Sequence, residues 1–232
     1  MSFPRRTSAR IALGAACLLC IAGAALLCTR LFYQRANPST QEYPVRGIDI
    51  SAHNGDIDFD ALAAGGNVQF AYVKATEGTD FIDRNFVRNI TGLSQAGIPV
   101  GAYHFFRFDT DGEMQAWNLV SAMRGRHLQL RPAIDVEEWT NAADLPTARI
   151  VSQLRAMIAI LRAEGHDPLI YTNKDGYHRF VKGKLDDHSL WLCSFTDPPV
   201  GDSRPLHIWQ YTHRGSLPGI PGSVDLDAAP SL

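Results

Sequence analysis

The spacing of apolar residues changes repeatedly between a strand period and a helix period from residue 46 onward. Five strand-like runs are each followed by a helix-compatible stretch, and they lie at residues 47–51, 69–74, 98–105, 132–136 and 168–172. After Lys182 three more strand-like runs, 189–194, 206–211 and 222–226, follow with no room for long helices between them. Five βα units and three further strands predict an α/β fold, a modified TIM-like barrel of eight strands.

The clearest predicted helix runs from about Leu145 to Glu164. Asp144 is its expected N-cap, Pro146 lies in its first turn and Gly165 follows its end. Six apolar residues share one face, which predicts the side that packs on the barrel: Ile150, Val151, Leu154, Met157, Ile158 and Leu161.

A second helix is predicted to end at Gly97. It places Phe86, Ile90 and Leu93 on its inner face. We interpret Asp83, just before this helix, as its N-cap rather than as a catalytic residue.

The first 40 residues have a different composition from the rest. A basic start with Arg5, Arg6 and Arg10 precedes an uninterrupted run of 18 apolar or small residues, 11–28, long enough to cross a bilayer. We favour a retained anchor with its amino end in the cytoplasm, and a cleaved signal sequence is the alternative. The predicted divisions are a cytoplasmic basic terminus (1–10), a transmembrane anchor or signal sequence (11–29), a polar linker (30–45) and the barrel domain (46–232).

Charge is divided as unevenly as hydropathy. The 232 residues have a formal net charge of −2, from 22 Lys+Arg and 24 Asp+Glu. Residues 1–40 hold five arginines and no acid, which leaves 17 basic against 24 acidic residues, a net −7, in the remainder. A domain this acidic has no general attraction for phosphate backbones, so nucleic acid is excluded as an expected partner.

Cysteine usage fits the same division. Three of the four cysteines lie in the apolar run, and Cys193 is alone in the predicted domain. The domain therefore has no internal disulfide, and we expect a monomer stabilised by its hydrophobic core.

Acidic residues occur where the predicted strands end. Asp49 ends the first strand, Asp135 and Glu137 end the fourth, and Asp225 ends the eighth. Barrel enzymes carry their sites at the carboxyl ends of the strands, so these four acids are expected to share one mouth. A single acid at a strand end is more often a turn former or a cap, and the prediction depends on all four occurring there.

Several carboxylates in one concave site repel one another, and one of them can then keep its proton at neutral pH. A protonated carboxyl beside ionised ones is what cleavage of a glycosidic bond requires, because one group protonates the leaving oxygen while negative charge stabilises the oxocarbenium-like transition state. No metal is expected, since His53 and His104 have no metal-binding spacing with the acids.

The chain resembles glycoside hydrolase family 25, the Chalaropsis-type lysozymes, from about Arg46 to its end. Six blocks carry the resemblance in order: 47–51 (GIDIS), 74–78 (KATEG), 101–105 (GAYHF), 135–137 (DVE), 210–211 (QY), and 218–220 (PGI) through 224–226 (VDL). The resemblance implies a barrel of five βα units and three strands. It also implies cleavage of the β-1,4 bond between N-acetylmuramic acid and N-acetylglucosamine in peptidoglycan.

The resemblance also implies residue roles. Glu137 would be the general acid and Asp135 its partner, either as a nucleophile or as a helper of the substrate's acetamido group. Asp49 and Asp225 would complete the acidic site. The implied substrate-binding set is Tyr103, Lys74, His104, Glu77, Trp191, Gln210 and Tyr211. For Trp191 and Trp209, stacking on sugars and packing within the barrel remain alternatives.

Some positions depart from the family pattern without removing a carboxylate. Asn54 stands where glutamine is frequent, Phe59 where tryptophan is, and Asp227 where asparagine usually follows the last acid. Cys193 and Phe195 replace a common alanine and tyrosine. These departures concern substrate contacts rather than the reaction.

The sequence therefore predicts a muramidase that acts in the cell envelope. Its expected partners are peptidoglycan strands and, through its first segment, the inner membrane, from which the domain faces the periplasm or exterior; no cofactor is expected. Two alternatives remain: a peptidoglycan-binding relative that has lost catalysis, and a metal-assisted polysaccharide hydrolase or deacetylase.

Overall fold

The computed structural model describes residues 36–142, 144–196 and 206–232. Its strands are β1 (Val45–Ile50), β2 (Phe70–Glu77), β3 (Phe81–Ile82), β4 (Val100–Phe105), β5 (Ala133–Asp135), β6 (Leu169–Asn173), β7 (Leu190–Cys193), β8 (Ile208–Gly215) and β9 (Val224–Ala229). Its helical segments are η1 (Ala52–Asn54), α2 (Phe59–Ala64), α3 (Phe86–Gln95), α4 (Gly112–Met123), α5 (Thr147–Ala163), α6 (Lys174–Gly176) and η2 (Tyr177–Val181).

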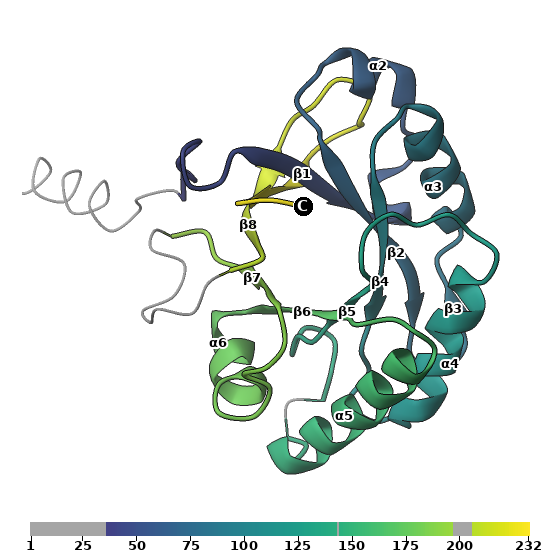
Figure 1. The fold of residues 1–232 in the computed structure, drawn as a ribbon, viewed down its shortest axis with the longest axis vertical. Coiled ribbons are helices and arrows are strands. Elements are labelled where there is room, and N and C mark those ends of the chain that lie inside the picture. Colours follow the sequence, from purple (N-terminus) through teal and green to yellow (C-terminus); the bar gives the residue numbers. More distant parts are fainter. Residues whose placement is uncertain (1–35, 143, 197–205) are drawn as a thin grey trace, which may run out of the picture. The chain divides into compact units, whose positions relative to one another are not determined.

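Eight of these strands close into a barrel. The sheet order is β1-β9-β8-β7-β6-β5-β4-β2, and a β1–β2 pairing closes the ring. Helices α3, α4 and α5 lie around the outside of the early strands, whereas the later strands β7 and β8 lack such a cover (Figure 1). The structure confirms the predicted barrel of five βα units and three strands. Strand β3, which was not predicted, extends the sheet beyond β2.

The last strand runs against the others. β9 pairs antiparallel with both β1 and β8, whereas every other neighbouring pair in the ring is parallel. Asp225 therefore lies near the beginning of β9, not at its end as predicted. Because the strand is reversed, its beginning lies at the mouth where the parallel strands end, and Asp225 is paired with Asp49.

Large aromatic rings fill the lower part of the barrel. Phe70, Tyr72, Tyr171 and Trp191 belong to a buried cluster formed by inward-facing positions of the strands. Glycines make room for them: a Cβ at Gly47 would lie 2.3 Å from the Phe70 ring. The rings fill the barrel below the mouth, and the open cavity lies above them, with Tyr171 and Trp191 in its lining.

A second, larger core lies between the strands and the helices. The six residues predicted for the inner face of α5 are all buried. The helix begins at Thr147 with Pro146 as its N-cap, so the predicted start and the Asp144 cap are wrong. The proline explains the difference, because a residue that precedes proline is disfavoured in the helical conformation.

Helix α3 also packs through its predicted face, since Phe86, Ile90 and Leu93 are buried. Its N-cap is Asn85, so the predicted cap at Asp83 is wrong. The Asp83 carboxylate instead accepts hydrogen bonds from the backbone N–H groups of Ala52 and Asn85, at 3.0 and 2.9 Å. Asp83 therefore ties the segment after β1 to the start of α3.

The amino-terminal edge of the described chain packs against the barrel. Ala36 is buried and its N–H donates to the Phe195 carbonyl at 3.0 Å. The Arg46 guanidinium donates to the carbonyl of Pro38 at 2.8 Å. The predicted span 11–29 lies outside the described residues, and within the described ranges no helix has the length and apolar character needed to cross a membrane.

Candidate active site

A cavity of about 1040 Å³ opens at the mouth of the barrel. All four predicted catalytic acids line it: Asp49, Asp135, Glu137 and Asp225. Asp49 and Asp135 are the more deeply buried, with 9% and 8% of their surfaces exposed. The structure thus brings together carboxyls from β1, β9 and the end of β5.

Burial is the largest cause of the raised pKa values in this cluster. Desolvation raises the pKa of Glu137 to about 6. A hydrogen bond from Asn173 lowers this pKa in part, and the charge of Asp225 raises it further. The pKa of Asp225 is also raised to about 6, mainly by burial. Asp135 has a pKa well above the usual range because it is buried and lies beside Glu137. The cluster therefore retains protons at mildly acidic pH.

Amide side chains hold two of the acids in place. Asn173, at the end of β6, donates from Nδ2 to Oε1 of Glu137 at 3.0 Å. Gln210 of β8 donates from Nε2 to Oδ2 of Asp49 at 2.6 Å, and its own Oε1 accepts from the Tyr171 hydroxyl at 2.9 Å. One Asp135 oxygen, Oδ1, is buried without a hydrogen-bond partner in the described part of the chain.

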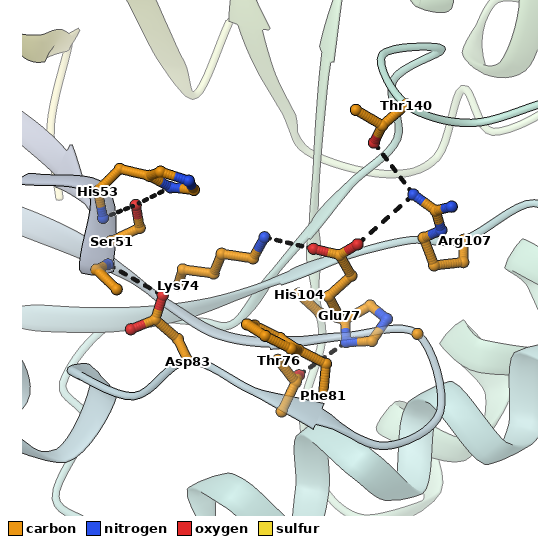
Figure 2. A network of polar contacts seen from close by, with 12 residues as sticks. Ser51, His53, Lys74, Thr76, Glu77, Phe81, Asp83, His104, Arg107 and Thr140 are labelled. Atoms are coloured by element: carbon orange, nitrogen blue, oxygen red, sulfur yellow. Dashed lines mark hydrogen bonds and ion pairs between the residues drawn. The ribbon is translucent and has the colours of Figure 1, made fainter.

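Basic residues line one wall of the cavity. Lys74 Nζ lies 2.6 Å from Oε2 of Glu77, and Arg107 Nη1 lies 3.5 Å from Oε1 of the same carboxylate. Arg107 Nη1 also donates to the Thr140 hydroxyl at 3.1 Å. Figure 2 shows Glu77 between the two cations, with Thr140 on the far side of Arg107. This chain of contacts connects β2 with the loops that follow β4 and β5.

Five of the seven predicted substrate-binding residues line the cavity: Tyr103, Lys74, Glu77, Trp191 and Gln210. Trp191 is only 1% exposed, and its ring packs between those of Tyr72 and Tyr171 with centroids 4.7 Å apart in both cases. Of the two alternatives for Trp191, the structure therefore supports packing within the barrel. Its ring forms part of the cavity floor. Trp209 is also buried and donates to the Ser194 carbonyl at 2.7 Å, away from the lining.

The other two predicted substrate-binding residues lie outside the cavity. His104 is fully buried, with Nδ1 2.7 Å from the Thr76 hydroxyl and Nε2 3.1 Å from Oε1 of Gln115. The prediction that it contacts the substrate is therefore wrong. Tyr211 is absent from the lining and lies beside Arg46, whose guanidinium is 5.7 Å from its ring. Successive residues of a strand face opposite sides, and each of these two follows a residue that faces inward.

Sequence reasoning missed several residues of the cavity, among them Asn173, Arg107 and Trp139. Asn173 and Arg107 were not singled out, and Trp139 was passed over although it comes two positions after Glu137. A signal for Trp139 was present, since an aromatic residue in the loop directly after an acidic strand end is well placed to contact a substrate. Asn173 and Arg107 gave no signal beyond their positions just after predicted strands.

The histidines do not form a metal site with the acids. His53 lines the cavity and contacts Ser51 at 3.2 Å, whereas His104 is in the layer outside the barrel. Among the described residues no group of three or more His, Cys, Asp or Glu side chains is arranged to hold a metal ion.

A barrel mouth with several desolvated carboxyls, among them Glu137 and Asp225 with pKa values raised to about 6, has the groups with which glycoside hydrolases cleave sugar bonds. The family described as Glycosyl hydrolases family 25 matches residues 48–220. The chain belongs to this family and is a glycoside hydrolase, which confirms the resemblance found in its sequence.

Relatives and solved structures agree with the family match. The chain is similar to the uncharacterized protein YegX of Escherichia coli O157:H7, at 30% identity over 80% of this chain and 69% of that protein. It is also similar to the N,O-diacetylmuramidase of Chalaropsis sp, at 30% identity over 78% and 96%. A family 25 glycosyl hydrolase structure from Bacillus anthracis matches with a TM-score of 0.75 at 30% identity, over 84% and 92% of the two chains.

The hydrogen bond from Asn173 provides a direct test of the site's electrostatics. Asn173→Ala removes a donor that stabilises the ionised form of Glu137, so the pKa of Glu137 should rise above its value of about 6. A carbon-13 NMR titration of the Glu137 carboxyl measures the change. Asn118→Ala is the matched control, because that amide binds the Gly78 and Phe81 carbonyls instead of an acid. An unchanged Glu137 titration in Asn173→Ala contradicts the assignment.

Proposed function

We propose that this protein is a lysozyme, an N-acetylmuramidase that hydrolyses the β-1,4 bond between N-acetylmuramic acid and N-acetylglucosamine in peptidoglycan. The observation that carries the proposal is Glu137 at the cavity wall, a carboxyl with a pKa raised to about 6 beside other acids. The names of the similar proteins, which include an autolytic lysozyme of Clostridium acetobutylicum, support the same substrate.

Glu137 is the proposed general acid. At mildly acidic pH it holds the proton that the leaving oxygen needs, and Asn173 fixes one of its oxygens while the carboxyl donates. Once the proton has left, the same hydrogen bond stabilises the carboxylate.

Asp135 is the proposed partner of Glu137. It lies two residues earlier on the same inward face and lines the cavity, with 8% of its surface exposed. From this position the Asp135 carboxylate can attack the sugar or orient the acetamido group. Burial and the charge of Glu137 raise the pKa of Asp135, and the positive charge of Lys74 opposes this rise and favours the ionised form.

The decisive experiment incubates the purified protein with peptidoglycan and identifies the sugar at the new reducing end. N-acetylmuramic acid there supports the proposal, and N-acetylglucosamine or intact strands contradict it.

Replacing the proposed acid tests its role directly. Glu137→Gln keeps the shape of the side chain but cannot supply the proton, so turnover of peptidoglycan should fall by about 100-fold or more while the fold persists. Glu138→Gln is the matched control, because Glu138 is ion-paired with Arg179 and is outside the cavity lining. A folded Glu137→Gln variant with turnover near that of the control would refute the assignment.

Trp139 is a proposed platform for a sugar ring. It lines the cavity yet is 77% exposed, and both neighbours in the chain are held in place. Glu138 is paired with Arg179, and Thr140, with a positive φ of 59°, accepts from Arg107. A large ring kept in solvent beside the acid offers an apolar face to a saccharide.

Removing that platform should weaken substrate binding more than turnover. For Trp139→Ala we expect KM for soluble peptidoglycan fragments to rise about tenfold with a nearly unchanged kcat, and Trp139→Phe should restore part of the loss. Trp117→Ala, at an exposed tryptophan of α4 outside the lining, should leave KM unchanged. Equal KM values for the two alanine variants would remove Trp139 from the binding site.

We also propose that residues 11–29 remain as a membrane anchor, with the domain in the cell envelope. The support is the sequence: Arg5, Arg6 and Arg10 favour an amino end held inside. Residues 41–232, with a net charge of −7, have little attraction for an anionic wall, and a tether keeps the domain close to its substrate without such attraction.

Cell fractionation tests the anchor separately from the enzyme activity. Cells that express the full chain should carry it in the membrane fraction at the mass of all 232 residues. A soluble product that begins near residues 25–40 would show a cleaved signal instead and would leave the muramidase proposal intact.

A further inference from the structure

Asp227 is a buried acid of β9 that the proposed reaction does not use. None of its surface is exposed, and it faces the barrel interior directly below the cavity. Its Oδ1 accepts a hydrogen bond from Nε1 of Trp191 at 2.9 Å. Burial raises the pKa of Asp227, and the indole N–H, which can only donate, opposes that rise and favours a carboxylate there.

The other oxygen of Asp227 lacks a donor. Oδ2 is buried and has no hydrogen-bond partner within the described ranges. Asp49 is the neighbouring acid: in the β1–β9 register Asp49 is opposite Asp225 and Gly47 is opposite Asp227, so Asp49 and Asp227 are diagonal neighbours on one face. An ionised Asp49 can only accept, whereas a protonated Asp49 can donate to Asp227 and satisfy it.

Neutral donors alone compensate this pair. Asp49 receives the Gln210 amide at 2.6 Å and Asp227 receives the Trp191 indole, and neither acid has a salt bridge to a basic side chain in the part of the chain that the structure describes. Two adjacent carboxylates without a cation repel strongly when both are buried. One proton between them removes the repulsion.

We propose that Asp49 and Asp227 share a single proton that resides on Asp49, and that Asp227 is the positioning residue that keeps it there. Asp49 then faces the cavity as a neutral hydrogen-bond donor, with the charge of the pair placed below it. This inference deepens the proposed muramidase function and rests on it for its effect on catalysis.

The remaining ionisable groups around the pair favour the same placement. The charge of Asp227 acts on Tyr72 of β2 and on Tyr211 of β8, and the charge of Asp225 on its own strand acts on Asp227. Asp49 faces two acids, Asp225 and Asp135, as well as Tyr103, Tyr171 and Cys193. Burial raises the pKa of each tyrosine and of the thiol, so these groups stay neutral. The additional charge of Asp135 acts on Asp49 and favours its protonated form.

The test replaces the lower carboxylate by its neutral isostere. Asp227→Asn keeps the volume and an oxygen for Trp191 but removes the charge, so Asp49 should titrate about one pH unit lower or more by carbon-13 NMR of its carboxyl. One limb of the pH profile of peptidoglycan hydrolysis should move to lower pH by a similar amount. The NMR titration needs no activity, so a failure of the proposed function would be seen separately.

Two further variants separate this role from simple packing. Trp191→Phe removes the donor to Asp227, which should shift the titration of Asp49 in the opposite direction, to higher pH. In an Asp49→Asn background, Asp227→Asn should leave the pH profile unchanged, because the shared proton is already absent. If Asp227→Asn leaves both the Asp49 titration and the pH profile unchanged, or only lowers stability, Asp227 is a structural residue and the proposal is overturned.

Discussion

The site depends on how the barrel is closed. β9 enters antiparallel between β1 and β8, and this reversal brings Asp225 to the same mouth as Asp49 and places Asp227 below them. Without that pairing the carboxyl end of β5, with Asp135 and Glu137, would face an open edge of the sheet in place of a wall of acids. The reversed strand therefore completes a polar site whose other acids come from β1 and from the end of β5.

Most of the fold could be predicted from the sequence because apolar periodicity reports directly on burial. The six-residue face of α5 and the eight barrel strands come from that signal, and the family match agrees with them. Apolar periodicity carries no information on strand direction. Asp225 was therefore predicted at the correct mouth of the barrel, but at the end of its strand instead of the beginning. Helix α5 begins two residues later than predicted because Leu145 precedes Pro146, and a residue before proline is disfavoured in the helical conformation.

The candidate site was predictable where a motif coincides with an inward-facing position. Tyr103 and Gln210 satisfy that condition, whereas His104 and Tyr211, their neighbours in the same motifs, face away. A sequence motif contains adjacent residues, but the side chains of adjacent residues in a strand point to opposite faces of the sheet. Contacts between loops, such as that of Arg107 with Thr140, depend on tertiary structure and could not be found from spacing alone.

The raised pKa values also affect folding. Glu137 titrates at about 6 when folded and near its ordinary value of 4.5 when unfolded, so between these pH values the unfolded chain loses a proton that the folded one keeps. Its contribution to stability is fully present below pH 4.5 and is lost as the pH rises through 6. Asp225 contributes with the same sign between 3.8 and about 6. The groups that prepare this barrel for acid catalysis therefore make it favour a mildly acidic environment.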